Sequence, residues 1–356
     1  MPCCKKSRRI GVVYAMTNAV DNNEVIAFRR GFDGTLSRHK AYETGGSGTG
    51  AQVVDPLSSQ GSLILSRDGR FLFAVNAGSN SISSFRVKRC GGLKLVDVEP
   101  SGGIFPNSLA VSHKLLYVTN AGDAANNIAS NVTGFYVKKD GNLKRIVEST
   151  KSLSAVNAQP ACVVFSPHGH KLVVSELNTN LLSVFLVNFD GTLTGPTVNN
   201  SSGGGPFGSV FLRKGFLLVS EAGPNALSSY TANSDGTLNV ISPSVLNGQL
   251  ATCWVSASPH EHFAYTSDAG SGTISIYRIK RDGRLSYVKS VFSTPDGTAA
   301  PLDSGVSKHG RNFYVLNGNE GTISVFRVRR NGRLTLLEVF VDTGLPELGA
   351  QGLAVI

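Results

Sequence analysis

One sequence motif recurs seven times along the chain. It consists of a hydrophobic strand, a polar residue, glycine or asparagine, a second strand, and a turn that usually has the sequence Asp-Gly-x-Leu. The turn glycines lie 45 to 58 residues apart and are Gly34, Gly92, Gly141, Gly191, Gly236, Gly283 and Gly332. A period of this length, made only of short strands and turns, is typical of a β-propeller with one repeat in each blade. The sequence therefore predicts an all-β fold, a seven-bladed β-propeller.

A further strand precedes the repeat and completes a four-stranded blade, whose strands we name A to D from the propeller axis outward. In the fourth repeat, strand A is predicted at residues 162–166, B at 171–175 and C at 182–187, with D after the turn at Asp190-Gly191. The short A–B and C–D connections are typical of hairpins. Antiparallel alternation therefore places these turns on one face of the ring, and the B–C and D–A loops on the other.

The two ends of the chain complement each other. The chain begins with a B strand at residues 10–15 that has no A strand before it, and ends with an A strand at 352–356 that has no B strand after it. Pairing these two segments in one blade removes the open edges of a linear array. We therefore expect a single propeller domain over residues 10–356, preceded by a disordered basic tail at residues 1–9.

Composition narrows the class of partner. No apolar stretch approaches the roughly 18 residues of a membrane helix, and the five cysteines share no metal-ligand spacing. We predict a cytoplasmic protein without a membrane, metal or cofactor partner, and leave its oligomeric state open. The net charge of +10 comes largely from basic pairs before the C–D turns, where they protect exposed strand edges. A polyanion-binding face is the alternative, but the repeats lack the interleaved aromatic residues of single-stranded nucleic-acid sites, so no nucleic-acid partner is expected.

Loop length favours the face that carries the B–C and D–A loops. The segment 37–60 is long and contains the glycine-rich stretch GGSGTG, and the third repeat carries an insertion at 121–131. Long irregular loops on a rigid scaffold are the usual location of binding residues. No helix or Lys-Ser/Thr follows the glycine-rich stretch, so a flexible loop is favoured over a phosphate-binding loop.

One polar residue ends each B strand, and together these residues form a ring: Asn18, Asn76, Asn120, Glu176, Glu221, Asp268 and Asn317. Asparagine and aspartate at a strand end often satisfy nearby backbone donors, which gives a structural alternative to a binding role. Glutamate is a poorer turn residue, so Glu176 and Glu221 are predicted to be catalytic. Neighbouring carboxylates would raise the proton affinity of one another and suit acid–base chemistry.

The remaining predicted site residues belong to the same ring or to the starts of the A strands. The predicted substrate-binding residues are Asn76, Asn120, Gln159, Asp268, Asn317, Trp254 and Phe207. Trp254 is the only tryptophan and could stack on a ring-shaped ligand, with packing between blades as the alternative. Five of the seven histidines fall in A–B turns on the opposite face and do not converge with the ring.

The stretches SPHGHKLVVSELNTNLLSVF, SRDGRFLFAVNAGSNSISSF and GSGTISIYRIKRDGRL resemble the lactonase family of seven-bladed propellers. That family includes 6-phosphogluconolactonases and 3-carboxy-cis,cis-muconate lactonizing enzymes, and the likeness is closest to an uncharacterised lactonase-like subgroup. The resemblance implies a catalytic glutamate at the end of a B strand, a position that Glu176 and Glu221 match. It also implies histidine and arginine near the starts of A strands, where this chain has Gln159-Pro160-Ala161-Cys162 and Pro206-Phe207-Gly208.

Three functions agree with these features. The first is a lactonase-like enzyme that hydrolyses a small cyclic ester, or forms one by cycloisomerisation, in the central channel. The second is a non-catalytic propeller that binds a small ligand or a protein through its long-loop face. The third is a cyclase for a specialised metabolite, in which the channel mainly enforces geometry.

Overall fold

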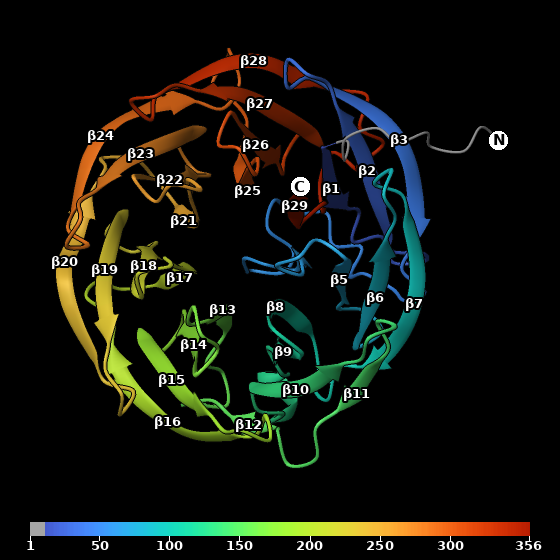
Figure 1. Ribbon diagram of the computed structural model, residues 1–356, viewed down its shortest axis with the longest axis vertical. Coiled ribbons are helices and arrows are strands. Elements are labelled where there is room, and N and C mark those ends of the chain that lie inside the picture. Colours follow the sequence, from blue (N-terminus) through green and yellow to red (C-terminus); the bar gives the residue numbers. More distant parts are fainter. Residues whose placement is uncertain (1–10) are drawn as a thin grey trace.

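A computed structural model describes residues 11–356, which form seven antiparallel sheets around one axis (Figure 1). The predicted all-β, seven-bladed propeller is confirmed. The predicted tail at residues 1–9, together with Ile10, lies outside the described residues. Within residues 11–356, no helix is long and apolar enough to cross a membrane.

Each of the first four blades has its A strand nearest the axis and its later strands further outward. The first blade contains β29 (Leu353–Val355), β1 (Val12–Met16), β2 (Glu24–Arg30) and β3 (Leu36–Glu43). The second contains β4 (Leu63–Leu65), β5 (Phe71–Asn76), β6 (Ser81–Val87) and β7 (Leu93–Pro100). The third contains β8 (Pro106–Ser112), β9 (Leu115–Asn120), β10 (Asn131–Val137) and β11 (Leu143–Arg145), with β12 (Lys151–Ser152) also paired to β10. The fourth contains β13 (Pro160–Phe165), β14 (Lys171–Glu176), β15 (Leu181–Val187) and β16 (Leu193–Asn200).

The last three blades follow the same order. The fifth contains β17 (Pro206–Phe211), β18 (Phe216–Glu221), β19 (Ala226–Ala232) and β20 (Leu238–Leu246). The sixth contains β21 (Thr252–Ala257), β22 (Phe263–Asp268), β23 (Thr273–Ile279) and β24 (Leu285–Phe292). The seventh contains β25 (Pro301–Val306), β26 (Asn312–Asn317), β27 (Thr322–Val328) and β28 (Leu334–Phe340). A short 3-10 helix, η1 (Ala124–Asn126), lies in the insertion of the third repeat.

The two ends of the chain pair as predicted. Strand β29 lies antiparallel to β1, with Tyr14 opposite Ala354, and so completes the first blade. The blades then pack face to face, which buries both faces of the B strands. All six residues of β5 and of β26 are buried, whereas in the outermost strand β28 only Leu334 is buried and the other residues are partly or fully exposed. The core is therefore divided into layers between neighbouring blades.

A repeated hydrogen bond joins neighbouring blades. A tyrosine on a B strand donates its hydroxyl proton to the carbonyl of the left-handed turn glycine in the next blade. The pairs are Tyr14 with Gly91 at 2.7 Å, Tyr265 with Gly332 at 3.1 Å, Tyr314 with Gly34 at 2.8 Å, and Tyr117 with Gly191. In the second repeat this glycine is Gly91, one residue before the predicted Gly92, because Gly91 is the one with positive φ.

Tyr314→Phe tests whether this hydrogen bond stabilises the closed ring. The substitution leaves the buried carbonyl of Gly34 without its hydroxyl donor, so the free energy of unfolding should fall by about 1 kcal/mol. The matched control is Tyr287→Phe, which removes a hydroxyl bonded to Ser290 on the exposed outer strand and should change stability much less. Urea unfolding followed by Trp254 fluorescence measures both, and equal losses would contradict the proposed role.

Candidate functional site

The polar residues that end the B strands are buried and bonded to the neighbouring C strand, except Asn18, whose side chain bonds Thr49 and the carbonyl of Gly349. The side-chain amide of Asn76 donates to Ser81 and Ser83, and that of Asn317 donates to Thr322 and Ser324. In both cases the acceptors lie five and seven residues further along the chain. This spacing follows from the hairpin register, in which the end of a B strand faces the start of a C strand.

Glu176 and Glu221 occupy equivalent positions in neighbouring blades, and each is completely buried. The carboxylate of Glu176 accepts hydrogen bonds from the hydroxyls of Ser183 at 2.5 Å, Thr179 at 2.9 Å and Ser154. The carboxylate of Glu221 accepts from Ser244 Oγ at 2.6 Å, the Gly203 amide at 2.8 Å, Ser201 Oγ at 3.2 Å and Tyr230 OH at 3.3 Å. Each glutamate therefore has a full set of donors from its own blade and from the D–A connection that leads into it. Their catalytic role stays a prediction.

Asp268 and Asn120 differ from the rest of the ring. Asp268 accepts hydrogen bonds from Asn247 and from four hydroxyl groups, yet burial raises the pKa of its carboxyl to about 6. Asn120 donates to Asn131 at 2.9 Å, but its own Oδ1 is buried without a partner. The ring residues thus bond mainly to neighbouring groups of the protein outside the ring, and Asn120 is the member with an unused acceptor.

The A strands show which end of the axial channel is open. Every A strand is buried at its start and partly exposed at its last one to three residues. These ends lead into the A–B turns. Solvent therefore enters the channel from the face that carries the A–B turns.

A segment between β3 and β4 closes the other end, and we call residues 55–60 the axial plug. In Figure 1 this blue segment runs into the middle of the ring. Gln60 alone bonds four blades: its carbonyl accepts from Ser108 Oγ at 2.6 Å, its backbone amide donates to the carbonyl of Ala161, and its Nε2 donates to that of Ser209. Its Oε1 accepts from the amide of Val255 at 2.7 Å. The long segment that was predicted to form a binding loop therefore carries residues that fill the channel.

Two predicted ligand-binding aromatic residues pack beside the plug. Trp254 is buried, and its indole N–H donates to the carbonyl of Ser59 at 3.0 Å. The ring of Phe207 meets Trp254 edge to face at 5.0 Å, and Val54 packs against the same cluster. Gln351 Nε2 also donates to the Ser59 carbonyl, at 2.6 Å. The polar edge of the tryptophan is thus used by the protein's own backbone.

The glycine-rich stretch before the plug is held by hydrogen bonds, in contrast to the flexible loop that the sequence predicted. The amides of Gly48 and Gly50 donate to the carbonyls of Ala19 and Asn18. A Cβ atom at Gly48 would lie 2.2 Å from the carbonyl carbon of Asn18. Glycine is therefore required at this position for the close approach of two backbones.

Two carboxylates interact where the plug begins, one from Asp55 of the plug itself and one from Asp303, and the sequence did not indicate this pairing. Asp303 on β25 accepts from the amide of Gly61 at 3.3 Å and from that of Gly352 at 3.1 Å. Burial raises the pKa of Asp303 to about 7. Burial, followed by the charge of Asp303, raises the pKa of Asp55 to about 7 as well, and Asp55 Oδ1 has no hydrogen-bond partner.

The pair has the properties of an acid–base site. Burial and like charge both oppose simultaneous ionisation of the two carboxyl groups, which favours retention of a proton on one of them near neutral pH. Asp55 remains half-buried, and the residues that follow Asp303 on β25 are partly exposed to the channel. In the sequence, Asp303 is recognisable only as part of an A-strand start, and Asp55 only as part of a long loop. Nothing in their spacing indicates that they meet.

The other predicted residues have different surroundings. Gln159 is half-buried and adopts φ of 49°, a left-handed conformation uncommon for a residue with a side chain. Its carbonyl accepts from the amide of Leu177, which fixes the backbone at the start of β13. Among the residues that the structure describes, no three His, Cys, Asp or Glu side chains are grouped to hold a metal ion.

Comparisons with known proteins agree with this architecture. The model of the lactonase family, described as a seven-bladed beta-propeller, matches residues 11–157 and 124–347. The chain belongs to the lactonase family of seven-bladed β-propellers. A comparison with curated proteins finds no match.

Solved structures resemble the protein over its whole length. A candidate 6-phosphogluconolactonase from Bacteroides fragilis has a TM-score of 0.76 at 20% identity, with 100% of both chains covered. The periplasmic gluconolactonase of Pseudomonas aeruginosa has a TM-score of 0.76 at 18% identity, with 98% of both chains covered. At these identities the likeness establishes the fold, and the chemistry has to be argued from the residues present.

The raised pKa values of Asp55 and Asp303 predict a pH-dependent stability. Their folded-state pKa of about 7 exceeds the value near 4 of an unfolded aspartate, so the folded protein binds the proton more tightly. This stabilisation is complete below about pH 4 and is lost as the pH rises through about 7. Asp303→Asn should therefore reduce the loss of unfolding free energy between pH 5 and pH 8.

Urea unfolding at several pH values measures this effect. The exposed Asp21→Asn is the control and should leave the slope unchanged. The quantity compared is the slope of the unfolding free energy against pH, not the free energy at one pH. Asparagine retains only one oxygen for the two amides that bond Asp303, so the substitution also changes stability in a way that does not depend on pH. An Asp303→Asn profile parallel to that of the unmodified protein would show that the pair does not share a proton.

Proposed function

We propose that this protein is an enzyme of small cyclic esters, a lactonase that adds water to its substrate in the axial channel. The observation that carries the proposal is the pair Asp55 and Asp303, with one carboxylate oxygen left without a partner at the closed end of a channel. The family to which the chain belongs supports the reaction class. The gluconolactonase names of its structural neighbours support a lactone as substrate.

The proposed chemistry uses the two protonation states of the pair. The ionised carboxylate takes a proton from a water molecule as the water oxygen attacks the lactone carbonyl carbon. The protonated carboxyl gives its proton to the ring oxygen as the C–O bond of the ring breaks. Water is added overall, the product is a hydroxy acid, and the pair again holds one proton, now on the carboxyl group that acted as the base.

The amides of Gly61 and Gly352 position Asp303 for this role. Both glycines have positive φ, and both follow a glutamine that bonds elsewhere in the channel. Asp303 is therefore held by backbone rather than by mobile side chains. No cationic side chain bonds either aspartate among the described residues, which favours a neutral lactone ring at the reacting end.

Glu176 and Glu221 keep their proposed catalytic role as the competing site. Each carboxylate already accepts three or four hydrogen bonds, so a proton-transfer role would require one of those donors to be displaced by substrate. The filled hydrogen-bonding shells also favour the second candidate function, a propeller that binds without catalysis. A cyclase would differ from both, because it would form its product without adding water to the substrate.

Turnover measurements on four variants separate these possibilities. Purified protein is mixed with 6-phosphogluconolactone, 3-carboxymuconate and a panel of neutral lactones in ¹⁸O-labelled water, and products are followed by NMR and mass spectrometry. We expect hydrolysis with ¹⁸O incorporation into a carboxyl group. Asp55→Asn and Asp303→Asn should lower kcat by about 100-fold or more, which is typical for the loss of a general acid or base.

The matched variants are Glu176→Gln and Glu221→Gln, with folding checked by near-ultraviolet circular dichroism. We expect kcat to change less than tenfold in these two. Loss of turnover in a folded glutamate variant, with both aspartate variants active, would place the chemistry on the ring instead. Absence of turnover on every compound would support the non-catalytic propeller.

A further inference from the structure

A large cavity lies on the face that carries the A–B turns. Its volume is about 1110 Å³. It extends over the A–B turns of the second, third and fourth blades and reaches the beginning of the A–B turn of the fifth blade. The C–D turn of the third blade also lines it. This is the face opposite to the one on which the sequence analysis expected binding. The volume is near the upper end of the range of small-molecule sites, larger than a single sugar lactone needs.

The floor of the cavity is apolar. It is formed by the last residues of four A strands, and these side chains are half-buried: Leu65, Val111, Phe165, Val210 and Phe211. Each exposes hydrocarbon to water inside a concave surface. A ligand with an apolar body would remove that surface from water and gain affinity in proportion to the area covered.

The rim of the cavity is strongly basic. Six cationic side chains line it, while the described lining residues include one carboxylate, Asp68; the cations are Arg67, Arg70, Lys114, Lys138, Lys139 and Arg213. Among the described residues, Arg213 forms an ion pair with Glu261 at 3.7 Å, whereas Arg67, Lys114 and Lys139 form none. A concave site of one sign with low-dielectric walls concentrates ions of the opposite sign.

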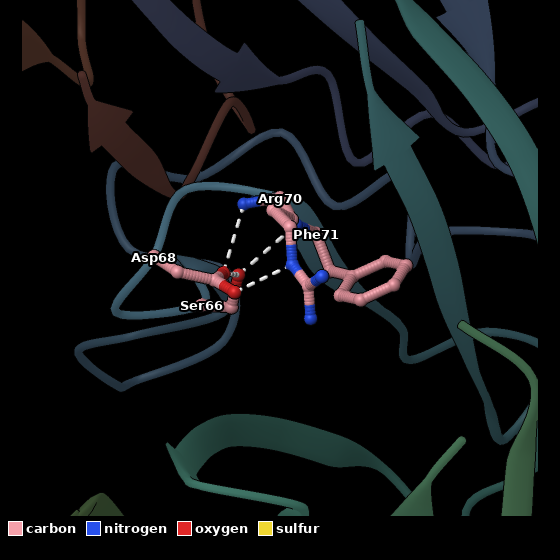
Figure 2. A network of polar contacts seen from close by, with 4 residues as sticks. All are labelled: Ser66, Asp68, Arg70 and Phe71. Atoms are coloured by element: carbon pink, nitrogen blue, oxygen red, sulfur yellow. Dashed lines mark hydrogen bonds and ion pairs between the residues drawn. The ribbon is translucent and has the colours of Figure 1, made fainter. Parts of the chain in front are cut away.

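The one carboxylate of the cavity bonds to residues of its own turn, as Figure 2 shows. Asp68 accepts from Ser66 Oγ at 2.7 Å, the Arg70 amide at 3.0 Å and Arg70 Nε at 2.6 Å. The Arg70 guanidinium also lies over the ring of Phe71, 5.7 Å from its centroid. Asp68 therefore holds Arg70 in place, and a single carboxylate leaves the lining of the cavity with an excess of positive charge.

We propose that this cavity binds a small organic anion with an apolar body, such as an alkyl or aryl carboxylate or phosphate monoester. The head group would lie against Arg67 and Lys114, and the apolar body would cover the floor between Val111 and Phe211. A nucleic acid is a poorer fit, because the apolar residues form a recessed floor rather than exposed aromatic platforms. The site is defined by binding and does not depend on the proposed lactone chemistry.

Calorimetric titration tests the proposal with four compounds of related structure: octyl phosphate, octanoate, octanol and inorganic phosphate. Octyl phosphate or octanoate should bind, and octanol and inorganic phosphate should bind at least tenfold more weakly. Comparing octyl phosphate with octanoate identifies the preferred head group. Lengthening the alkyl chain should increase affinity roughly threefold to fourfold per methylene if the apolar floor is used.

Charge reversal at the rim locates the site. The double variant Arg67→Glu with Lys114→Glu should weaken binding of the preferred compound at least tenfold. Its matched control is Lys280→Glu with Arg281→Glu, which changes the net charge equally at an exposed turn of the sixth blade and should change affinity less than twofold. All four side chains are exposed, so folding should be preserved.

Three outcomes would overturn the proposal. Equal weakening in the control would mean that binding follows net charge rather than this cavity. Inorganic phosphate binding as tightly as octyl phosphate would mean a simple anion site without use of the floor. Displacement of octyl phosphate by a 20-nucleotide oligothymidine at lower concentration would identify a polyanion surface.

Discussion

The closed end of the propeller depends on hydrogen bonds between the axial plug and strands from several blades. Strands that converge on an axis leave backbone groups whose partners must come from outside their own sheets. Gln60 supplies both a donor and an acceptor to different blades, and Ser59 accepts from Trp254 and Gln351. A Cβ atom at Gly208 would lie 2.3 Å from Gln60 Oε1, so the blades and the plug are fitted to one another. The plug thereby determines which face of the channel admits solvent.

The number of hydrogen-bond donors separates the buried acids of this protein into two kinds. The ring glutamates and Asp268 each receive several hydrogen bonds, mainly from serine and threonine hydroxyls. Asp303 receives two, and one oxygen of Asp55 receives none. Burial raises the pKa of Asp268, Asp55 and Asp303, and donors to the carboxylate offset that effect. Asp268, which has the most hydroxyl donors of these three, therefore has a pKa of about 6, below the value of about 7 for Asp55 and Asp303.

The sequence was sufficient for the fold because the fold is built from local, repeated signals. Turn glycines, strand patterns and the complementary termini predicted seven blades and the pairing of β1 with β29. The polar ring was found for the same reason, since each member ends a B strand. The hydrogen bonds of the ring were harder to anticipate, because they depend on a hydroxyl group that lies seven residues later and faces the same side of the sheet.

The plug and the acid pair could not be found in this way, because Asp55 and Asp303 are separated by most of the chain and their meeting depends on how the ring closes. The basic cavity was missed for a related reason: its cations come from separate A–B turns and one C–D turn, each of which alone resembles an ordinary solvated hairpin.

The acid pair lies at the closed end of the channel and the basic cavity at the open face, and the second blade links the two. Gly61, whose amide bonds Asp303, precedes β4, and Leu65 at the end of β4 lies on the cavity floor. Four residues separate these positions, which is at most about 13 Å at about 3.3 Å per residue. Salt screens buried charges only weakly, so an anion bound in the cavity would act on the buried pair. A neighbouring negative charge favours the protonated form of a carboxyl group. An anion in the cavity would therefore help the pair to retain its proton, and the two sites can be occupied together.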